Sequence, residues 1–270
     1  MRCIFCKENS DSSKSIEHII PESLGNKNDC LQPGIICDKC NNYFSREVEK
    51  PFLELPEIKN LRFRQSILSK RNKVPTIQGF LSPNMPVTII NKPEDQFPFS
   101  IDTDQNGIDY ILKENEGHII IPFMDLPESS NIVSRFLAKV ALEALAKRLL
   151  TQDHKFIEEI VDEKQLDIIR DYARRGSKKD WPISIRRIYS ENKTISDKEN
   201  RKLQTVQESD ILVTEWNEWF FVLALFGVEY VINYGGPEID GYNRWLQEND
   251  NKSPLYCDIR TPIKNKLKSM

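Results

Sequence analysis

The chain contains no hydrophobic run long enough to cross a membrane, and only three of its 270 residues are histidine. A helix that spans a bilayer needs about 20 consecutive apolar residues, and no segment approaches that length. The first residues, Met1–Lys7, also lack the apolar stretch of a secretory signal. We therefore expect a soluble, cytoplasmic protein.

A strong charge of either sign is absent as well. Lys and Arg number 38 and Asp and Glu number 41, so the formal net charge is −3. A sum this close to neutral does not indicate nucleic-acid binding, but it can hide local patches. The segment 59–73 has basic residues and no acidic one, and its candidate phosphate contacts are Arg62, Arg64, Lys70 and Arg71. A solvated helix face has the same composition, and this alternative stays open.

Cysteines are few, yet four of the six form two C-x-x-C pairs. The pairs consist of Cys3, Cys6, Cys37 and Cys40, and we interpret the remaining Cys30 and Cys257 as free thiols. In a reducing compartment, two such pairs indicate a metal site before they indicate disulfides. Zinc accepts four thiolates in a tetrahedron, and each tight turn supplies two of them. A shell of four cysteines leaves no open position, so we predict a structural zinc.

The distribution of residue types predicts two domains. Residues 1–52 show little aliphatic periodicity and are too few to bury a core unaided, which a structural metal would compensate. Pro51 and Pro56 should interrupt regular structure and mark the boundary. Residues 53–270 are then a larger mixed α/β domain, and the fold class is α+β.

Hydrophobic patterning predicts the main elements of the larger domain. Apolar residues at three- and four-residue spacings predict a helix over 129–150, and a second helix is expected from 155 to about 174. Two apolar runs joined at Gly227 predict buried strands over 219–226 and 228–234. The proline-punctuated segment 74–125 predicts short strands, with Asn106-Gly107 as a turn and strands at 87–90, 110–112 and 118–121.

The chemistry-bearing residues lie between the two cysteine pairs. Residues 15–21 read Ser-Ile-Glu-His-Ile-Ile-Pro, and residues 37–44 read Cys-Asp-Lys-Cys-Asn-Asn-Tyr-Phe. Phosphodiester hydrolysis needs a base for water and a hard divalent cation. Carboxylate and amide oxygens suit Mg²⁺ or Mn²⁺, and a neutral imidazole suits the base. Neighbouring residues of a strand point to opposite faces, so Glu17 and His18 share a pocket only if the backbone bends or one side chain reaches over an edge.

The order C-x-x-C, E-H-I-I-P, C-x-x-C-N resembles the zinc-containing branch of the HNH endonucleases, members of the ββα-metal superfamily. The resemblance covers about residues 3–50. It implies that His18 is the general base and that Glu17 binds the catalytic metal. It implies Asn41 as the second protein ligand, with Asn42 as the alternative in register. It also implies a hairpin that carries His18, followed by a helix that begins near Asn41.

The function implied by the resemblance is metal-dependent cleavage of DNA, most simply double-stranded. The structural ion is Zn²⁺ and the catalytic ion is Mg²⁺ or Mn²⁺. One position departs from the family pattern, in which an asparagine precedes a leucine and pins the loop that holds the histidine. Here Cys30 precedes Leu31, so that role passes to Asn28 or Asp29, or the loop is held otherwise.

Two other functions are compatible with the same sequence. A zinc-ribbon module with a decayed catalytic centre would bind nucleic acid or protein, and His18→Ala would then change nothing. A third interpretation makes the nuclease an effector of a prokaryotic defence or mobile-element system, in which the larger domain contacts a protein partner or senses a signal.

Several residues that resemble functional ones are interpreted as structural. We expect His118 and His154 to be structural or exposed, and we assign an aromatic group to the core rather than to base stacking. That group consists of Trp216, Trp219, Phe220 and Tyr234.

Overall fold

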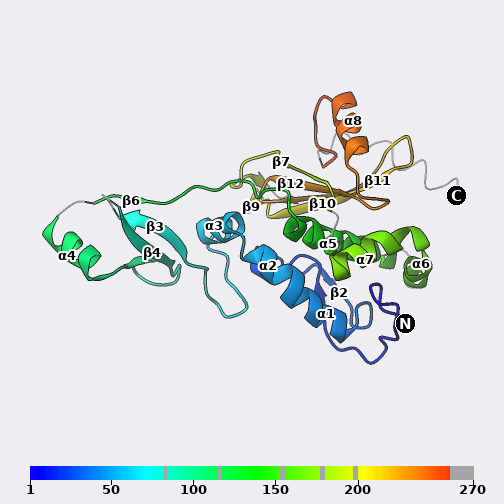
Figure 1. The fold of residues 1–270 in the computed structure, drawn as a ribbon, viewed down its shortest axis with the longest axis horizontal. Coiled ribbons are helices and arrows are strands. Elements are labelled where there is room, and N and C mark those ends of the chain that lie inside the picture. The colour runs from blue at the N-terminus through cyan, green and yellow to red at the C-terminus, as the bar shows by residue number, and fades with distance from the viewer. Residues whose placement is uncertain (82–83, 115–116, 152–155, 177–179, 197–199, 256–270) are drawn as a thin grey trace. The chain divides into compact units, whose positions relative to one another are not determined.

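The computed structural model describes residues 1–81, 84–114, 117–151, 156–176, 180–196 and 200–255 (Figure 1). His154 and Cys257 lie outside these residues. The fold mixes helices and strands, as predicted. The chain forms two compact units. The first contains residues 1–19, 28–51 and the described residues from 128 onward, and the second contains residues 20–27 and 52–127.

The N-terminal part of the first unit has the strand–strand–helix order that the resemblance implies. Strands β1 (Glu17–His18) and β2 (Cys30–Leu31) pair antiparallel. Helix α1 (Asp38–Phe44) follows, and the π-helix η2 (Ser45–Glu49) and helix α2 (Lys50–Leu53) continue it. Helix α1 begins at Asp38 because the Cys37 sulfur accepts a hydrogen bond from the Cys40 N–H and caps the first turn.

The expected proline break is confirmed at Pro56 but not at Pro51, since α2 ends at Leu53 and residues 54 and 55 lie outside any helix. Pro51 lies within α2, and Pro56 is the first residue of helix α3 (Pro56–Arg64), where its missing N–H costs nothing.

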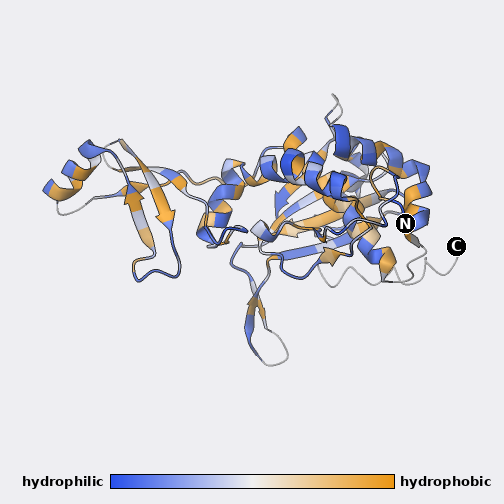
Figure 2. Ribbon diagram, turned by 90° about the horizontal axis from the view of Figure 1, so that it is seen from below, coloured by the Kyte–Doolittle hydropathy of each residue, from blue (hydrophilic) through white to orange (hydrophobic). Residues whose placement is uncertain are grey.

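A four-stranded antiparallel sheet forms the core of the first unit. Its order is β10 (Gln207–Val213), β11 (Trp219–Leu225), β12 (Val228–Asn233) and β7 (Ile183–Arg187). The two strands predicted around Gly227 are confirmed, and the turn between them uses positive φ at Phe226 and Gly227. Helix α8 (Asp240–Glu248) covers one face of the sheet, and α5 (Asn131–Leu150) lies on the other (Figure 1). Strand β11 is almost entirely hydrophobic, and the strands show orange stretches of hydrophobic residues in Figure 2.

Helix α5 confirms the predicted helix over 129–150, and the Ser130 side chain caps it by accepting from the Val133 N–H. The second predicted helix is divided into α6 (Phe156–Asp162), a 3₁₀ turn η3 (Lys164–Leu166) and α7 (Asp167–Arg175). The division occurs at Glu163, whose backbone is extended and whose carboxylate accepts from the Gln165 N–H. A separate two-stranded ribbon consists of β8 (Thr194–Ser196) and β9 (Lys202–Gln204).

The second unit is built on a sheet in the order β5, β4, β3, β6. These strands are Phe99–Asp102, Met85–Asn91, Ile77–Leu81 and Ile119–Ile120. The unit also contains the 3₁₀ turn η1 (Glu22–Leu24) and α3, and Phe63, Val87 and Ile89 lie in its core. The strand predicted over 87–90 is confirmed, and of the strand predicted over 118–121 only β6 forms.

The strand predicted over 110–112 is wrong, because these residues belong to helix α4 (Gln105–Lys113). The Asp104 carboxylate accepts from the Gly107 N–H at 2.9 Å. This cap makes Asn106-Gly107 part of the first helical turn instead of a hairpin turn.

The compact units differ from the predicted division into residues 1–52 and 53–270. The chain does change units between Pro51 and Phe52, but from Glu128 onward it returns to the first unit. The reason is that α5 packs against β2 and η2. In the described part of the chain, no helix combines the length and the apolarity needed to cross a membrane.

Candidate active site and zinc centre

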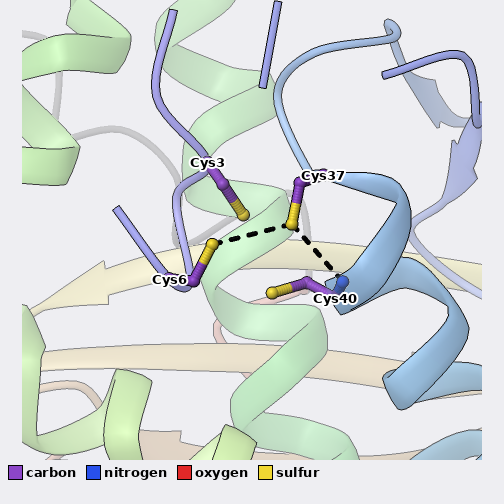
Figure 3. Close-up of side chains that lie close together, drawn as sticks. All are labelled: Cys3, Cys6, Cys37 and Cys40. Atoms are coloured by element: carbon purple, nitrogen blue, oxygen red, sulfur yellow. Dashed lines mark hydrogen bonds between the residues drawn. The ribbon is translucent and has the colours of Figure 1, made fainter. Parts of the chain in front are cut away.

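The four paired cysteines converge on one point, as predicted. Their sulfur atoms all lie within 4.8 Å of one another, and the Cys6 and Cys37 sulfurs are 3.6 Å apart (Figure 3). Four thiolates around one zinc ion have sulfurs about 3.8 Å apart, given Zn–S bonds of about 2.3 Å. None of the five described cysteines forms a disulfide. The donor set and its spacing therefore fit a structural zinc ion.

The thiol electrostatics also favour a cation at this point. A hydrogen bond from the Cys40 thiol lowers the pKa of Cys3 to about 4, and burial raises the pKa of Cys6 to about 11. The pKa of Cys40 is raised by its hydrogen bond to Cys3 and by burial. Thiols this close cannot all ionise beside one another unless a cation compensates their charge. A zinc ion would hold all four as thiolates.

The first cysteine turn is held by main-chain contacts and by the core. The Cys3 carbonyl accepts from the Lys7 N–H at 2.9 Å, and Ile4 N–H donates to the Ile35 carbonyl at 3.0 Å. The rings of Phe5 and Phe44 pack with their centroids 4.3 Å apart, so the turn is packed on α1. The cysteine pairs are therefore fixed relative to one another by a small core as well as by sulfur chemistry.

Strand β1 carries Glu17 and His18 on opposite faces of the hairpin. Glu17 pairs with Leu31, and both are buried; His18 pairs with Cys30, and both are half-buried. Alternation along a strand turns successive side chains to opposite faces. The Glu17–Leu31 face is therefore the inner face, and the His18–Cys30 face is the outer one.

The inner face places Glu17 in a buried ionic cluster. Lys139 of α5 is fully buried, and its Nζ lies 2.5 Å from Glu17 Oε1 and 2.7 Å from Glu49 Oε1. Glu143, one turn further along α5, is also fully buried and lies 2.9 Å from the same Nζ. A fourth contact runs from Nζ to the His18 carbonyl at 3.4 Å.

Burial controls the protonation of this cluster. Desolvation raises the pKa of Glu17 despite the neighbouring ammonium, and it raises the pKa of Glu143 well above its ordinary value. Burial alone would lower the pKa of Lys139, but the three carboxylates overcome that effect and raise it. Lys139 is therefore charged, and the proton that the cluster shares resides most readily on Glu143, the most buried carboxyl.

On the outer face, His18 lies next to Cys30. The His18 Nδ1 and Cys30 Sγ atoms are 3.3 Å apart. The carbonyl of Cys30 accepts from Lys147 Nζ of α5 at 2.7 Å. The imidazole therefore has one nitrogen directed at a thiol, in a strand that is tied to α5.

Asn41 lies in the first turn of α1, next to a zinc-site cysteine. It is half-buried, whereas Asn42 is exposed. In the described part of the chain, no hydrogen bond or ion pair joins Glu17, His18 and Asn41 to one another. The structure thus brings Glu17 beside Glu49 and His18 beside Cys30, and the shared site of Glu17, His18 and Asn41 stays a prediction.

Sequence reasoning missed the residue that pins the loop after the Glu-His pair. Asn26 is buried, and its side-chain amide donates to the Ile20 carbonyl at 2.7 Å. The family's middle position is Cys30, on the strand opposite His18. The Asp29 carbonyl accepts from the Ile19 N–H at 3.2 Å. The Gly25-Asn26 step was the available signal, because Gly25 adopts the positive φ of a turn.

The predicted basic patch is only partly a surface. Lys70 and Arg71 are exposed, and the Arg64 guanidinium lies 4.9 Å from the centre of the Phe123 ring. Arg62 is buried, so its side chain is not presented to a phosphate.

Among the aromatic residues, the expected core role is correct for Phe220 and Tyr234. It is wrong for Trp216 and Trp219, which are exposed. Trp216 precedes β11 and Trp219 begins it, so neither reaches the buried centre of the strand.

Comparison with known proteins identifies the cysteine-rich segment. Residues 3–55 match the HNH endonuclease family model. The resemblance drawn from the sequence is thereby confirmed, and the match spans both cysteine pairs, the Glu-His pair and α1. No curated protein and no solved structure matches the chain. The HNH segment indicates a function of the nuclease type, and it indicates nucleic acid in general as the partner.

Proposed function

We propose that the protein is a metal-dependent HNH endonuclease that hydrolyses phosphodiester bonds of double-stranded DNA. The observation that carries this proposal is the match of residues 3–55 to the HNH endonucleases, in a segment that folds as a hairpin bearing Glu17-His18 and a zinc-site helix bearing Asn41. The place of action that fits a thiolate zinc site is the reducing cytoplasm.

His18 is the proposed general base. Its ring is half-exposed, which gives water access, and its Nδ1 faces the Cys30 sulfur. When Nδ1 carries the proton and donates to that sulfur, the lone pair of Nε2 is free to take a proton from water. The water then attacks phosphorus in line with the leaving 3′ oxygen.

Glu17 and Asn41 are the proposed protein ligands of the catalytic cation. A carboxylate and an amide oxygen form a hard donor set that fits Mg²⁺ or Mn²⁺. Lys139 pairs with Oε1 of Glu17, and a carboxylate has a second oxygen to offer a cation. When bound, the cation would supply charge stabilisation at the scissile phosphate.

Basic residues of the segment 59–73 are the proposed contacts to the DNA backbone, of which Lys70 and Arg71 are exposed and Arg64 is half-buried. Arg64, Lys70 and Arg71 keep this role, and Arg62 is left out because it is buried. A protein partner or signal that acts through residues beyond 52, as in a defence system, is part of the same proposal and would set when the nuclease acts.

One observation favours the binding-module alternative. Glu17 is buried and ion-paired, and it lies on the face of β1 opposite to His18. A zinc-ribbon module that only binds its partner does not need Glu17 as a metal ligand, so this arrangement would not impair its function. The two functions make different predictions for a single substitution.

The test is plasmid cleavage by wild type and His18→Ala, with Mg²⁺, with Mn²⁺ and with a chelator. We expect nicking or cutting by wild type in either metal, and a loss of about 10²–10⁴-fold in His18→Ala. His118→Ala is the matched control, because His118 is an exposed histidine outside the HNH segment. Zinc content per chain verifies folding of each variant. Equal inertness of wild type and His18→Ala toward duplex and single-stranded DNA and RNA would favour the binding module.

A further inference from the structure

Two lysines of α5 reach the two strands of the hairpin that carries the Glu-His pair. Lys139 contacts the Glu17 carboxylate and the His18 carbonyl of β1, and Lys147 donates to the Cys30 carbonyl of β2. The lysines are eight residues apart, which is about 12 Å along a helix. Helix α5 begins at Asn131, far beyond the segment that matches the HNH endonucleases. The hairpin is therefore held by a helix from outside its own family segment.

Lys139 also joins the strand to the helical part of the HNH segment. Its Nζ bonds Glu17 of β1 at 2.5 Å and Glu49 of η2 at 2.7 Å. The π-helix η2 directly continues α1, the helix that carries Asn41. One ammonium group thus sets how closely the strand with Glu17 approaches the helix with the second proposed ligand.

Stability alone does not explain a lysine at this position. A fully buried ammonium among carboxylates pays a large desolvation penalty, and apolar residues of similar volume often stabilise a core equally well. The ammonium donates hydrogen bonds to Glu17, Glu49 and the His18 carbonyl, and Glu143 adds an ion pair at 2.9 Å. What the charge adds over an apolar side chain is direction, because it fixes one oxygen of Glu17 at a defined point.

We propose that Lys139 is a positioning residue of the nuclease centre, acting through Glu17. By holding Oε1 of Glu17 and the carbonyl of His18, it sets the orientation of the Glu-His pair and directs the second Glu17 oxygen to the cation. Lys147 supports the second strand of the same pair through the Cys30 carbonyl. This inference rests on the proposed function, and it makes α5 part of the catalytic unit.

The experiment compares two full-length variants. In one the Lys139 ammonium is removed alone, and in the other it is removed together with two of the carboxylates that surround it. Lys139→Met leaves buried carboxylates without a counter-charge and will destabilise the fold. The informative variant is therefore Lys139→Met combined with Glu49→Gln and Glu143→Gln, which removes the ammonium and two of the carboxylates together. Arg148→Met is the control, because Arg148 lies on the exposed side of α5 and pairs with Asp210. Zinc content and denaturant unfolding establish that each variant is folded.

Two readouts separate this inference from the proposed function. The first is the kcat and KM for DNA cleavage, and the second is Mn²⁺ binding measured by electron paramagnetic resonance, with Glu17→Gln marking the site. We expect the triple variant to lose about 10–100-fold in kcat and in Mn²⁺ affinity, with the KM for DNA unchanged. Wild-type kcat and Mn²⁺ affinity in a folded triple variant would overturn the positioning role. Wild type that binds Mn²⁺ in a Glu17- and Lys139-dependent manner but cleaves no nucleic acid would support positioning and overturn the nuclease.

Discussion

The Nε atom of Arg170 lies 2.6 Å from the carbonyl oxygen of Ile4, a residue between the two cysteines of the first zinc-site pair. Arg170 is buried, and its guanidinium also donates to the Ile160 carbonyl at 2.8 Å and pairs with Asp167. Helix α7 therefore holds the cysteine turn in place through Arg170, and its Asp167 also pairs with Lys7 at 2.6 Å. The zinc centre depends on residues far away in the sequence, as the Glu-His pair does.

Arg170→Met should destabilise the protein, because it leaves two buried carbonyls without their donors. We expect the free energy of unfolding to fall by about 3 kcal/mol, measured by urea denaturation of zinc-loaded protein. Arg175→Met is the control on the same helix. Its side chain is exposed and 3.7 Å from Asp171, so its effect should stay within about 0.5 kcal/mol. Equal losses in the two variants would mean that the contact to Ile4 adds nothing.

Cys3→Ser should reduce bound zinc and loosen the N-terminal segment. Serine removes one of four thiolates, and the remaining three do not close the tetrahedral shell. Zinc per chain, measured by atomic emission, should fall clearly below the wild-type value, and protease cleavage within residues 1–50 should accelerate. Cys30→Ser should keep the full zinc content, because Cys30 lies outside the four-sulfur cluster. An unchanged zinc content in Cys3→Ser would rule the site out.

The zinc site and α5 could be predicted from the sequence because each depends on a short-range sequence pattern. The spacing of Cys3, Cys6, Cys37 and Cys40 predicts a shared ion, and three- and four-residue periodicity predicts α5. The ion pair between Glu17 and Lys139 is not readable in this way, because 122 residues separate the two positions. The sequence marks Glu17 as a candidate metal ligand, but it gives no sign that Lys139 is its partner, and only the packing of α5 on the hairpin buries the two together.

Two other predictions were wrong because a local sequence pattern was interpreted without the residues around it. Asn106-Gly107 is a strong turn signal, but the carboxylate of Asp104 captures the Gly107 N–H and starts a helix. The apolar pattern assigned Trp219 to the core together with the strand it begins, although the start of the strand is exposed. The apolar pattern predicts the strand correctly. It does not predict which residues of the strand are covered by a helix and which remain exposed.

Glu143→Gln should alter the pH dependence of stability. Burial raises the pKa of Glu143 well above its ordinary value of 4.5, among Lys139, Glu17 and Glu49. Above pH 4.5 the unfolded chain has released this proton while the folded chain still holds it, so stability falls as the pH rises toward the folded pKa. The glutamine variant cannot release a proton.

The free energy of unfolding, measured from pH 5 to pH 8, should therefore decline less steeply in Glu143→Gln than in wild type. One proton accounts for up to about 1.4 kcal/mol per pH unit. Identical slopes for the two proteins would show that Glu143 does not hold the proton.

Cys30→Ala should impair catalysis by releasing the His18 ring. The Cys30 sulfur faces Nδ1 at 3.3 Å, and the partner of one ring nitrogen determines which nitrogen is free to act as a base. We expect about a 10-fold lower kcat and a displaced pH–rate profile in Cys30→Ala. Cys30→Ser, which keeps a polar atom at this position, should remain close to wild type. A wild-type pH–rate profile in the alanine variant would leave the ring orientation to other groups.

Lys70→Glu combined with Arg71→Glu should weaken DNA binding without regard to sequence. Both side chains are exposed, and phosphate contacts contribute through counterion release, so each lost contact lowers the slope of log affinity against log salt by about 1. Binding is measured by fluorescence anisotropy on duplexes of two unrelated sequences, in chelator so that no cleavage occurs.

Lys252→Glu is the control, because Lys252 is an exposed lysine outside the patch. The double variant should show a lower affinity and a salt slope smaller by about 2, equally for both duplexes. Each phosphate contact that is lost allows a counterion to bind the DNA again, which must lower the salt slope. An unchanged slope would therefore mean that other basic side chains contact the phosphates.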